Sequence, residues 1–263
     1  MALNPLLDSR DLRFTLFELL EVDKLTSIPK YADLDRSMFE DVIDLAEKVA
    51  MEQVYSISAE SEKQGVKYDP DTHRVTVPDS FKPALKAYHE AGFIGIPEDP
   101  EIGGMGMPAC IAMAANEIFT AASLAFTVYP GLSHGAAMLI DTFGTEEQKK
   151  LYIPKMLSGE WGGTMCLTEP EAGSDVGNLK TKAVKQPDGA YKITGQKIFI
   201  SGGEGDIYSN IIHPVLARIE GDPPGTKGIS IFIVPKYRVN PDGSIGELND
   251  IVCTGIEHKM GFH

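Results

Sequence analysis

The hydrophobic pattern of this chain changes near residue 160, and this change limits the possible folds more than any other feature. Before that point, apolar residues such as Leu12 and Leu16 recur at helical spacing. Beyond it, residues that favour strands cluster, as in Tyr191–Thr194. Helices followed by strands predict an α+β chain, with a helical domain over residues 1–160 and a β-domain over residues 161–263.

Capping residues mark several of the expected helix ends. Asp8 precedes the first apolar helical pattern and is a good N-cap. Thr145 and Gln148 form a capping-box pattern for a later helix. Residues 109–142 are rich in Ala, Met, Ile and Leu, and we expect two buried helices there with a break at Pro130.

The composition excludes several classes of function. The net charge of −14 disfavours nucleic acid and anionic membranes as partners. The three cysteines are widely spaced, so the sequence has neither a disulfide framework nor a paired-cysteine zinc pattern. The N-terminus does not resemble a signal peptide, and no run of about 18 apolar residues could span a bilayer. We therefore expect a soluble protein of the cytoplasm.

Two motifs place backbone donors and hydroxyls at expected strand ends. Residues 165–175 read Met-Cys-Leu-Thr-Glu-Pro-Glu-Ala-Gly-Ser-Asp, an apolar run followed by a turn of small polar residues. Residues 197–203 read Lys-Ile-Phe-Ile-Ser-Gly-Gly and predict a second strand that ends in a hydroxyl. If the strands are neighbours, Thr168 and Ser201 offer donors to one flat ligand with acceptors along its edge, as a flavin has.

These motifs, with the tail Glu-His-Lys-Met-Gly over residues 257–261, resemble the flavin- and substrate-binding middle of the acyl-CoA dehydrogenases. The opening residues resemble the subgroup that includes 3-methylmercaptopropionyl-CoA dehydrogenase. The resemblance implies a β-barrel-like middle domain and contacts from Ser174 to the CoA part of the substrate. The flavin contacts it implies are Met165, Leu167, Thr168, Gly173, Phe199, Ile200 and Ser201. Glu171 replaces the small residue usual in the first motif.

The reaction that the resemblance implies is FAD-dependent α,β-dehydrogenation of an acyl-CoA thioester. The family's base is a glutamate of a C-terminal helical domain, and no residue here matches it, so no catalytic residue is assigned. We interpret Glu169 as a structural hydrogen-bond acceptor. The chain is expected to be the first two domains of a three-domain enzyme and inactive alone. An electron-transfer flavoprotein is the implied acceptor, and a homodimer or tetramer the implied full-length assembly.

Other functions remain open at this point. An acyl-CoA oxidase has the same motifs and differs in passing electrons to oxygen. Residues 131–135 read Gly-Leu-Ser-His-Gly and match the nucleophile elbow of a serine hydrolase, with Ser133 as nucleophile, although Pro130 would interrupt the strand that such an elbow needs. A module that only binds ligands is a third class. The six histidines show no metal-binding spacing, so no metal is expected.

Overall fold

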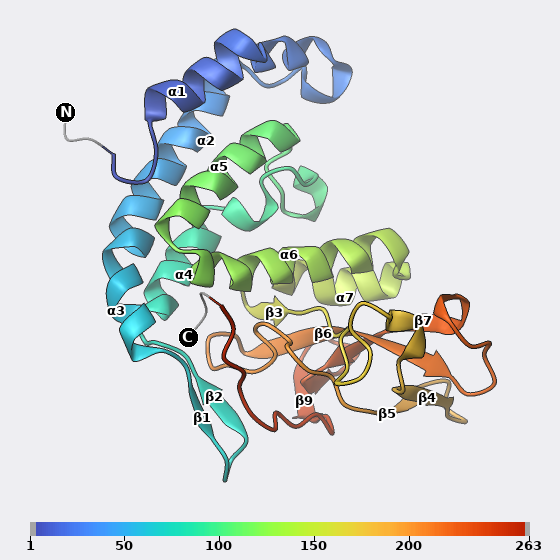
Figure 1. The fold of residues 1–263 in the computed structure, drawn as a ribbon. Helices are drawn as coiled ribbons and strands as arrows, with labels where there is room; N and C mark the ends of the chain where they lie inside the picture. The colour runs from blue at the N-terminus through green and yellow to red at the C-terminus, as the bar shows by residue number, and fades with distance from the viewer. Residues whose placement is uncertain (1–3, 261–263) are drawn as a thin grey trace.

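The computed structural model describes residues 4–260, and Figure 1 shows the helices stacked above the strands. The α-helices are α1 (Ser9–Arg13), α2 (Arg36–Val49), α3 (Ser56–Gln64), α4 (Phe81–Glu90), α5 (Ala109–Ala122), α6 (Leu124–Phe143) and α7 (Glu146–Leu157). π-helical turns follow α1 (Phe14–Leu19) and α2 (Ala50–Tyr55). Short 3-10 turns lie at Val22–Ser27, Pro29–Tyr31, Phe93–Gly95, Pro100–Ile102, Val176–Asn178 and Thr226–Gly228. The strands are β1 (Lys67–Asp69), β2 (Arg74–Thr76), β3 (Trp161–Gly163), β4 (Lys182–Lys185), β5 (Tyr191–Thr194), β6 (Asn210–Ile219), β7 (Ile229–Pro235), β8 (Tyr237–Val239) and β9 (Ile245–Leu248).

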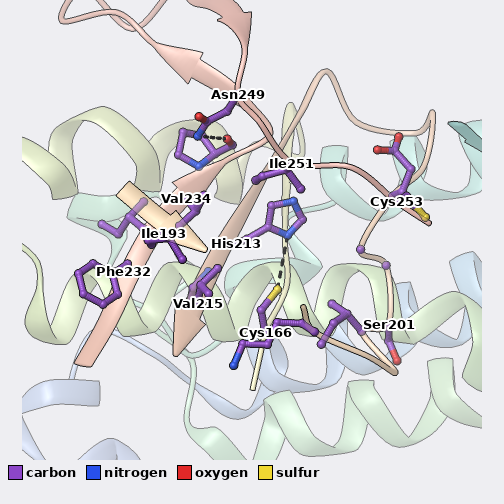
Figure 2. A pocket seen from close by; sticks show the side chains of 18 of the residues that line it. Cys166, Ile193, Ser201, His213, Val215, Phe232, Val234, Asn249, Ile251 and Cys253 are labelled. Atoms are coloured by element: carbon purple, nitrogen blue, oxygen red, sulfur yellow. Dashed lines mark hydrogen bonds between the residues drawn. The ribbon is translucent and has the colours of Figure 1, made fainter. Parts of the chain in front are cut away.

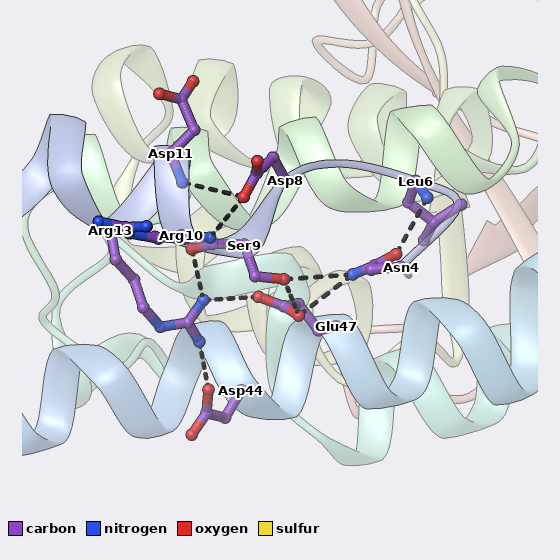
Figure 3. A network of polar contacts seen from close by, with 9 residues as sticks. All are labelled: Asn4, Leu6, Asp8, Ser9, Arg10, Asp11, Arg13, Asp44 and Glu47. Atoms are coloured by element: carbon purple, nitrogen blue, oxygen red, sulfur yellow. Dashed lines mark hydrogen bonds and ion pairs between the residues drawn. The ribbon is translucent and has the colours of Figure 1, made fainter. Parts of the chain in front are cut away.

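The N-terminal helix is held on α2 by a polar network (Figure 3). The Asp8 carboxylate caps α1 by accepting from the backbone N–H groups of Arg10 and Asp11, as the sequence predicts. Arg13 donates to Glu47 at 2.8 Å and also pairs with Asp44. Burial alone would raise the pKa of Glu47, but these and other hydrogen bonds lower it.

The helical layer is built around α2, α5 and α6. Phe39, Ile43 and Phe126 are fully buried in its core. The expected break at Pro130 is wrong, because α6 continues through this residue and the two helices instead separate at Ser123. The Ser123 backbone is extended, and its hydroxyl accepts from the Phe126 N–H as an N-cap. A cap therefore outweighs the proline as the signal that divides this region.

The helix α7 connects the two layers. The capping box predicted for its start is confirmed, because Thr145 and Gln148 exchange both hydrogen bonds. After α7 the chain turns at Gly159, whose φ of 78° is in the left-handed region, and enters β3. In Figure 1, α6 and α7 lie over the strands on the side of β3. The helical layer therefore covers one face of the sheet.

The long strand β6 organises a five-stranded sheet. On one edge it pairs antiparallel with β7, and on the other it pairs in parallel first with β3 and then with β4, which forms a hairpin with β5. The α+β prediction is confirmed. The described strands form an open sheet, with two separate two-stranded ladders, and do not close into a barrel. None of the described helices is long and apolar enough to cross a bilayer.

The two motif segments are less regular than the sequence predicts. Between β3 and β4, residues 165–168 follow the edge of β6, but only Cys166 forms a β-bridge, with Val215. Residues 197–200, expected as a strand, have no strand assignment. The reason lies in Phe199, whose φ of 60° is incompatible with an extended chain. Both segments are nevertheless fixed by hydrogen bonds.

Candidate functional site

The two motif segments lie side by side. The backbone N–H of Ile198 donates to the carbonyl of Thr168 at 2.9 Å. The Lys197 ammonium donates to the carbonyl of Leu167, also at 2.9 Å. Segments separated by thirty positions in the chain are therefore neighbours at this point. We call residues 165–168 and 197–201 together the junction.

Glu169 fixes the junction from within. Its carboxylate accepts from the backbone N–H groups of Lys180 and Thr181, from the Thr181 hydroxyl and from the Lys197 ammonium. Burial alone would raise the pKa of Glu169, but these hydrogen bonds lower it to about 2. Only 5% of this side chain is exposed. The interpretation of Glu169 as a structural acceptor is confirmed.

Phe199 and Ser201 form the exposed rim of the junction. Phe199 is 52% exposed, although its backbone is in a conformation that bulky residues rarely adopt. Its carbonyl and the Ser201 hydroxyl both accept from the Lys259 ammonium, each at 2.7 Å. The next residue, Gly202, has a φ of 63°, and a Cβ placed there would lie 3.6 Å from the ring of Tyr129 on α6. The helical layer thus borders the same rim.

A groove of about 1990 Å³ runs from this rim along the sheet. Figure 2 shows Ile193, Phe232 and Val234 at one end and Ser201 and Cys253 at the other. The groove is lined by three of the predicted flavin contacts, Phe199, Ile200 and Ser201. Met165, Leu167, Thr168, Gly173 and Ser174 do not line it. The structure therefore brings Thr168 and Ser201 onto neighbouring segments but not into one groove.

The remaining motif residues lie at the surface beside the junction. Met165, Leu167 and Thr168 are half-buried, whereas Gly173 and Ser174 are exposed. A Cβ on Gly173 would lie 3.7 Å from the side-chain methyl of Thr168, so this glycine folds back toward the first segment. The turn that directly precedes Gly173 is closed by paired backbone hydrogen bonds between Glu169 and Ala172. Gly173 and Ser174 are therefore accessible to solvent beside a fixed turn.

A buried imidazole lies under the first segment. His213, on β6, has its Nδ1 2.7 Å from the Thr164 hydroxyl and 3.8 Å from the sulfur of Cys166. Within residues 4–260, its Nε2 has no hydrogen-bond partner. Burial lowers the pKa of His213 to about 4, and the charge of Lys236 adds to this. Burial raises the pKa of the Cys166 thiol, so Cys166 is protonated and a poor nucleophile.

A buried ion pair holds the glycine turn that follows Ser201. Lys236 pairs with Glu204, and their side chains are 7% and 10% exposed. The backbone N–H of Lys236 also donates to the carbonyl of Ile211 at 2.8 Å. Since Glu204 follows Gly202 and Gly203 directly, the pair ties this turn to the sheet.

Serine hydrolysis by Ser133 is ruled out by its position. The residue lies inside helix α6 rather than at a strand-to-helix turn, and it is fully buried. Its hydroxyl donates to the carbonyl of Tyr129 at 2.8 Å and accepts from the N–H of Gly163 at 3.0 Å. The neighbouring His134 is paired with Glu98 instead. Ser133 therefore joins α6 to β3, and the hydrolase alternative is wrong.

Sequence reasoning missed three side chains that build the site: Lys197, His213 and Lys259. Lys197 stands at the start of the second motif, where it was treated only as a strand residue. His213 is an isolated histidine in an apolar strand, which gives no spacing signal. Lys259 lies in the tail that contributed to the resemblance, and its contact with Ser201 joins positions that only the fold brings together. In the part of the chain that the structure describes, no three His, Cys, Asp or Glu side chains gather as a metal site.

Known families and proteins agree with this architecture. The profile of the acyl-CoA dehydrogenase N-terminal domain matches residues 39–160, and that of the acyl-CoA dehydrogenase middle domain matches residues 164–260. The chain is 42% identical over 254 residues to a broad-specificity linear acyl-CoA dehydrogenase of Mycobacterium tuberculosis. That alignment covers 96% of this chain and 41% of that protein. It is 34% identical over 252 residues to the 3-methylmercaptopropionyl-CoA dehydrogenase of Ruegeria pomeroyi, covering 96% of this chain and 42% of that protein.

Solved structures show the same fold. An acyl-CoA dehydrogenase from Bacillus anthracis, in complex with FAD, superposes with a TM-score of 0.59 and 28% identity. The match covers 76% of this chain and 31% of that one. The chain thus spans less than half the length of these relatives, 41% and 42% of the two curated proteins.

Proposed function

The chain belongs to the acyl-CoA dehydrogenase family, and we propose that its junction binds FAD for the α,β-dehydrogenation of an acyl-CoA thioester. The observation that carries this proposal is the contact between the two motif segments, made by the hydrogen bond from Ile198 to Thr168. This contact supports the proposal because it brings Thr168 of the first motif beside the second motif. We also propose the division into a helical domain, 1–160, and a β-domain, 161–263.

The residues of the junction suit a flavin. The half-exposed Phe199 ring offers a flat apolar surface on which the isoalloxazine ring can pack. Because Lys259 donates to the oxygen of Ser201, the hydroxyl proton of Ser201 is free to donate to an acceptor on the ring edge. Thr168 adds a second hydroxyl on the neighbouring segment. We propose the same role for the backbone of Met165, Leu167, Gly173 and Ile200.

Bound FAD would supply the acceptor for the hydride that leaves the β-carbon of the acyl-CoA, while the α-proton passes to a base and a 2-enoyl-CoA is formed. We assign that base to none of the described residues. Glu169 is unsuited to the role, because its carboxylate already accepts four hydrogen bonds. Ser174, exposed in the turn after the first motif, is proposed to contact the CoA part of the substrate.

Only the family membership supports our proposals for the electron acceptor, the assembly and the location. We propose an electron-transfer flavoprotein as acceptor, a homodimer or tetramer as the functional assembly, and the cytoplasm as the location. In an acyl-CoA oxidase, the flavin reduced by substrate would be reoxidised rapidly in air, whereas in a dehydrogenase it would be reoxidised slowly. Stopped-flow mixing of the reduced protein with oxygenated buffer separates these two reactions.

A titration with FAD tests the proposal. Flavin fluorescence should be quenched and the visible absorption band should shift as the purified protein is added. The variant Ser201→Ala should bind FAD about fivefold more weakly, since a hydrogen bond contributes on the order of 1 kcal/mol. Thr194→Ala, which removes an exposed hydroxyl on β5, is the matched control. Equal affinity for FAD in the wild type and both variants would contradict the assignment of Ser201 as a flavin contact.

A further inference from the structure

Lys259 makes an unusual pair of contacts at the rim of the junction. Its ammonium donates to the Phe199 carbonyl and to the Ser201 hydroxyl, both at 2.7 Å. These acceptors lie about sixty positions earlier in the chain, so the tail has returned to close the junction. A third N–H of the ammonium remains, and none of residues 4–260 accepts a hydrogen bond from it.

Within the described residues, the charge of Lys259 has no direct anionic partner. Over residues 4–260, no carboxylate forms an ion pair with it, and Glu257 acts on it only through space. Burial lowers the pKa of the Lys259 ammonium and Glu257 partly offsets this. The chain as a whole has a net charge of −14, so a cation without a carboxylate partner among residues 4–260 is a local exception at this rim. A positive charge that is partly removed from water attracts negative charge on a nearby group more strongly than a fully solvated one does.

The backbone that Lys259 contacts is strained. Phe199 has a φ of 60°, a conformation that costs a bulky residue free energy and persists only where its surroundings impose it. In this conformation the Phe199 carbonyl and the Ser201 hydroxyl converge on one ammonium. Lys259 therefore contributes to holding the turn that presents the Phe199 ring and the Ser201 hydroxyl.

We propose that Lys259 is a positioning residue for the flavin: it holds the Phe199–Ser201 turn, directs the Ser201 hydroxyl proton away from itself, and places a positive charge beside the ring. This inference rests on the proposed function. A positive charge beside a flavin raises the midpoint potential, because reduction adds electrons to the ring. The same residue thus contributes to both affinity and potential.

The test compares Lys259→Met with Lys259→Arg and with Lys185→Met. Lys185 is exposed on β4, does not line the groove, and serves as the matched loss of one positive charge. The dissociation constant for FAD is measured by fluorescence titration, and the midpoint potential of the bound FAD by spectroelectrochemistry. Lys259→Met should bind FAD about tenfold or more weakly, because a charge-assisted hydrogen bond is lost. Its potential should fall, while Lys259→Arg should restore both values toward those of the wild type.

A double-mutant cycle separates this contact from general destabilisation. If Lys259 acts through Ser201, the effects of Lys259→Met and Ser201→Ala on FAD affinity should be less than additive. Thermal unfolding of each variant shows whether the fold is kept.

The outcomes distinguish the two proposals. Equal dissociation constants and potentials for the wild type and Lys259→Met overturn the role of Lys259 and leave the flavin site intact. Additive effects in the cycle overturn the route through Ser201. A wild-type protein that takes up no FAD overturns the proposed function and, with it, this inference.

Discussion

Lys197 and Glu169 form an ion pair of 2.9 Å that joins the two motifs, with 11% and 5% of their side chains exposed. The pair is buried inside the junction rather than at its surface. Glu169 also accepts hydrogen bonds from Lys180 and Thr181, so this one carboxylate connects the first motif, the start of β4 and the second motif. The geometry of the proposed flavin site therefore depends on an interaction in which the ligand takes no part.

Removing the partner of a buried charge lowers the free energy of unfolding more than removing an exposed charged side chain does. We predict that Lys197→Met lowers the free energy of unfolding by about 2–4 kcal/mol, because Glu169 loses a charged donor. Urea denaturation followed by circular dichroism measures this change. Lys185→Met, an exposed lysine on β4, is the control and should change stability by less than about 0.5 kcal/mol. A loss below about 1 kcal/mol in Lys197→Met would show that the pair is not important for stability.

The lowered pKa of Glu169 predicts a dependence of stability on pH. The carboxyl is ionised in the folded protein down to about pH 2, whereas its ordinary pKa is 4.5. The stabilisation is therefore fully present above about pH 4.5 and is lost as the pH falls toward 2. Compared with Glu169→Gln, the wild type should lose on the order of 2 kcal/mol more across this range. Glu171→Gln, exposed in the same motif, should keep the wild-type profile.

His213 predicts a second dependence in a different range. Burial holds its pKa at about 4 against an ordinary value of 6.5, so the folded protein keeps a neutral imidazole. The stabilisation that the neutral His213 contributes is fully present above pH 6.5 and is lost as the pH falls through 4. Between these values only the unfolded chain takes up the proton. The stability difference between the wild type and His213→Phe should shrink over this range. His258→Phe, which removes an exposed imidazole, is the control, and a similar pH profile in both variants would contradict the account.

Ser133 is predicted to be structural. Ser133→Ala should lower the free energy of unfolding by about 1–3 kcal/mol, because the buried N–H of Gly163 loses its acceptor. The wild type should not react with a fluorophosphonate probe, since Ser133 is fully buried in α6. Mass spectrometry after incubation with the probe checks this, and a label on Ser133 would restore the hydrolase interpretation.

The sequence predicts the class of the fold because helix caps and strand alternation are local signals. Asp8 and Thr145 cap helices as expected, and Tyr191–Thr194 is a strand. Local signals fail where tertiary contacts decide. Pro130 lies inside α6, where it is itself buried in the protein. The run ending at Ile200 is turned by the positive φ of Phe199.

The candidate site was predictable only as two motifs. Their spacing and residue types indicate donors at the end of each segment, and the structure shows the segments in contact. The side chains that fix this contact come from elsewhere. His213 and Lys259 reach the site through the register of β6 and the return of the tail, which depend on the whole fold. A sequence pattern contains no direct signal for such long-range pairs.

A structure of the protein with bound FAD tests the central claim most directly. The account predicts that the isoalloxazine ring packs against Phe199, with a ring-edge acceptor about 3 Å from the Ser201 hydroxyl oxygen. A flavin bound at a distance from the junction, with Phe199 and Ser201 still facing solvent, would contradict it.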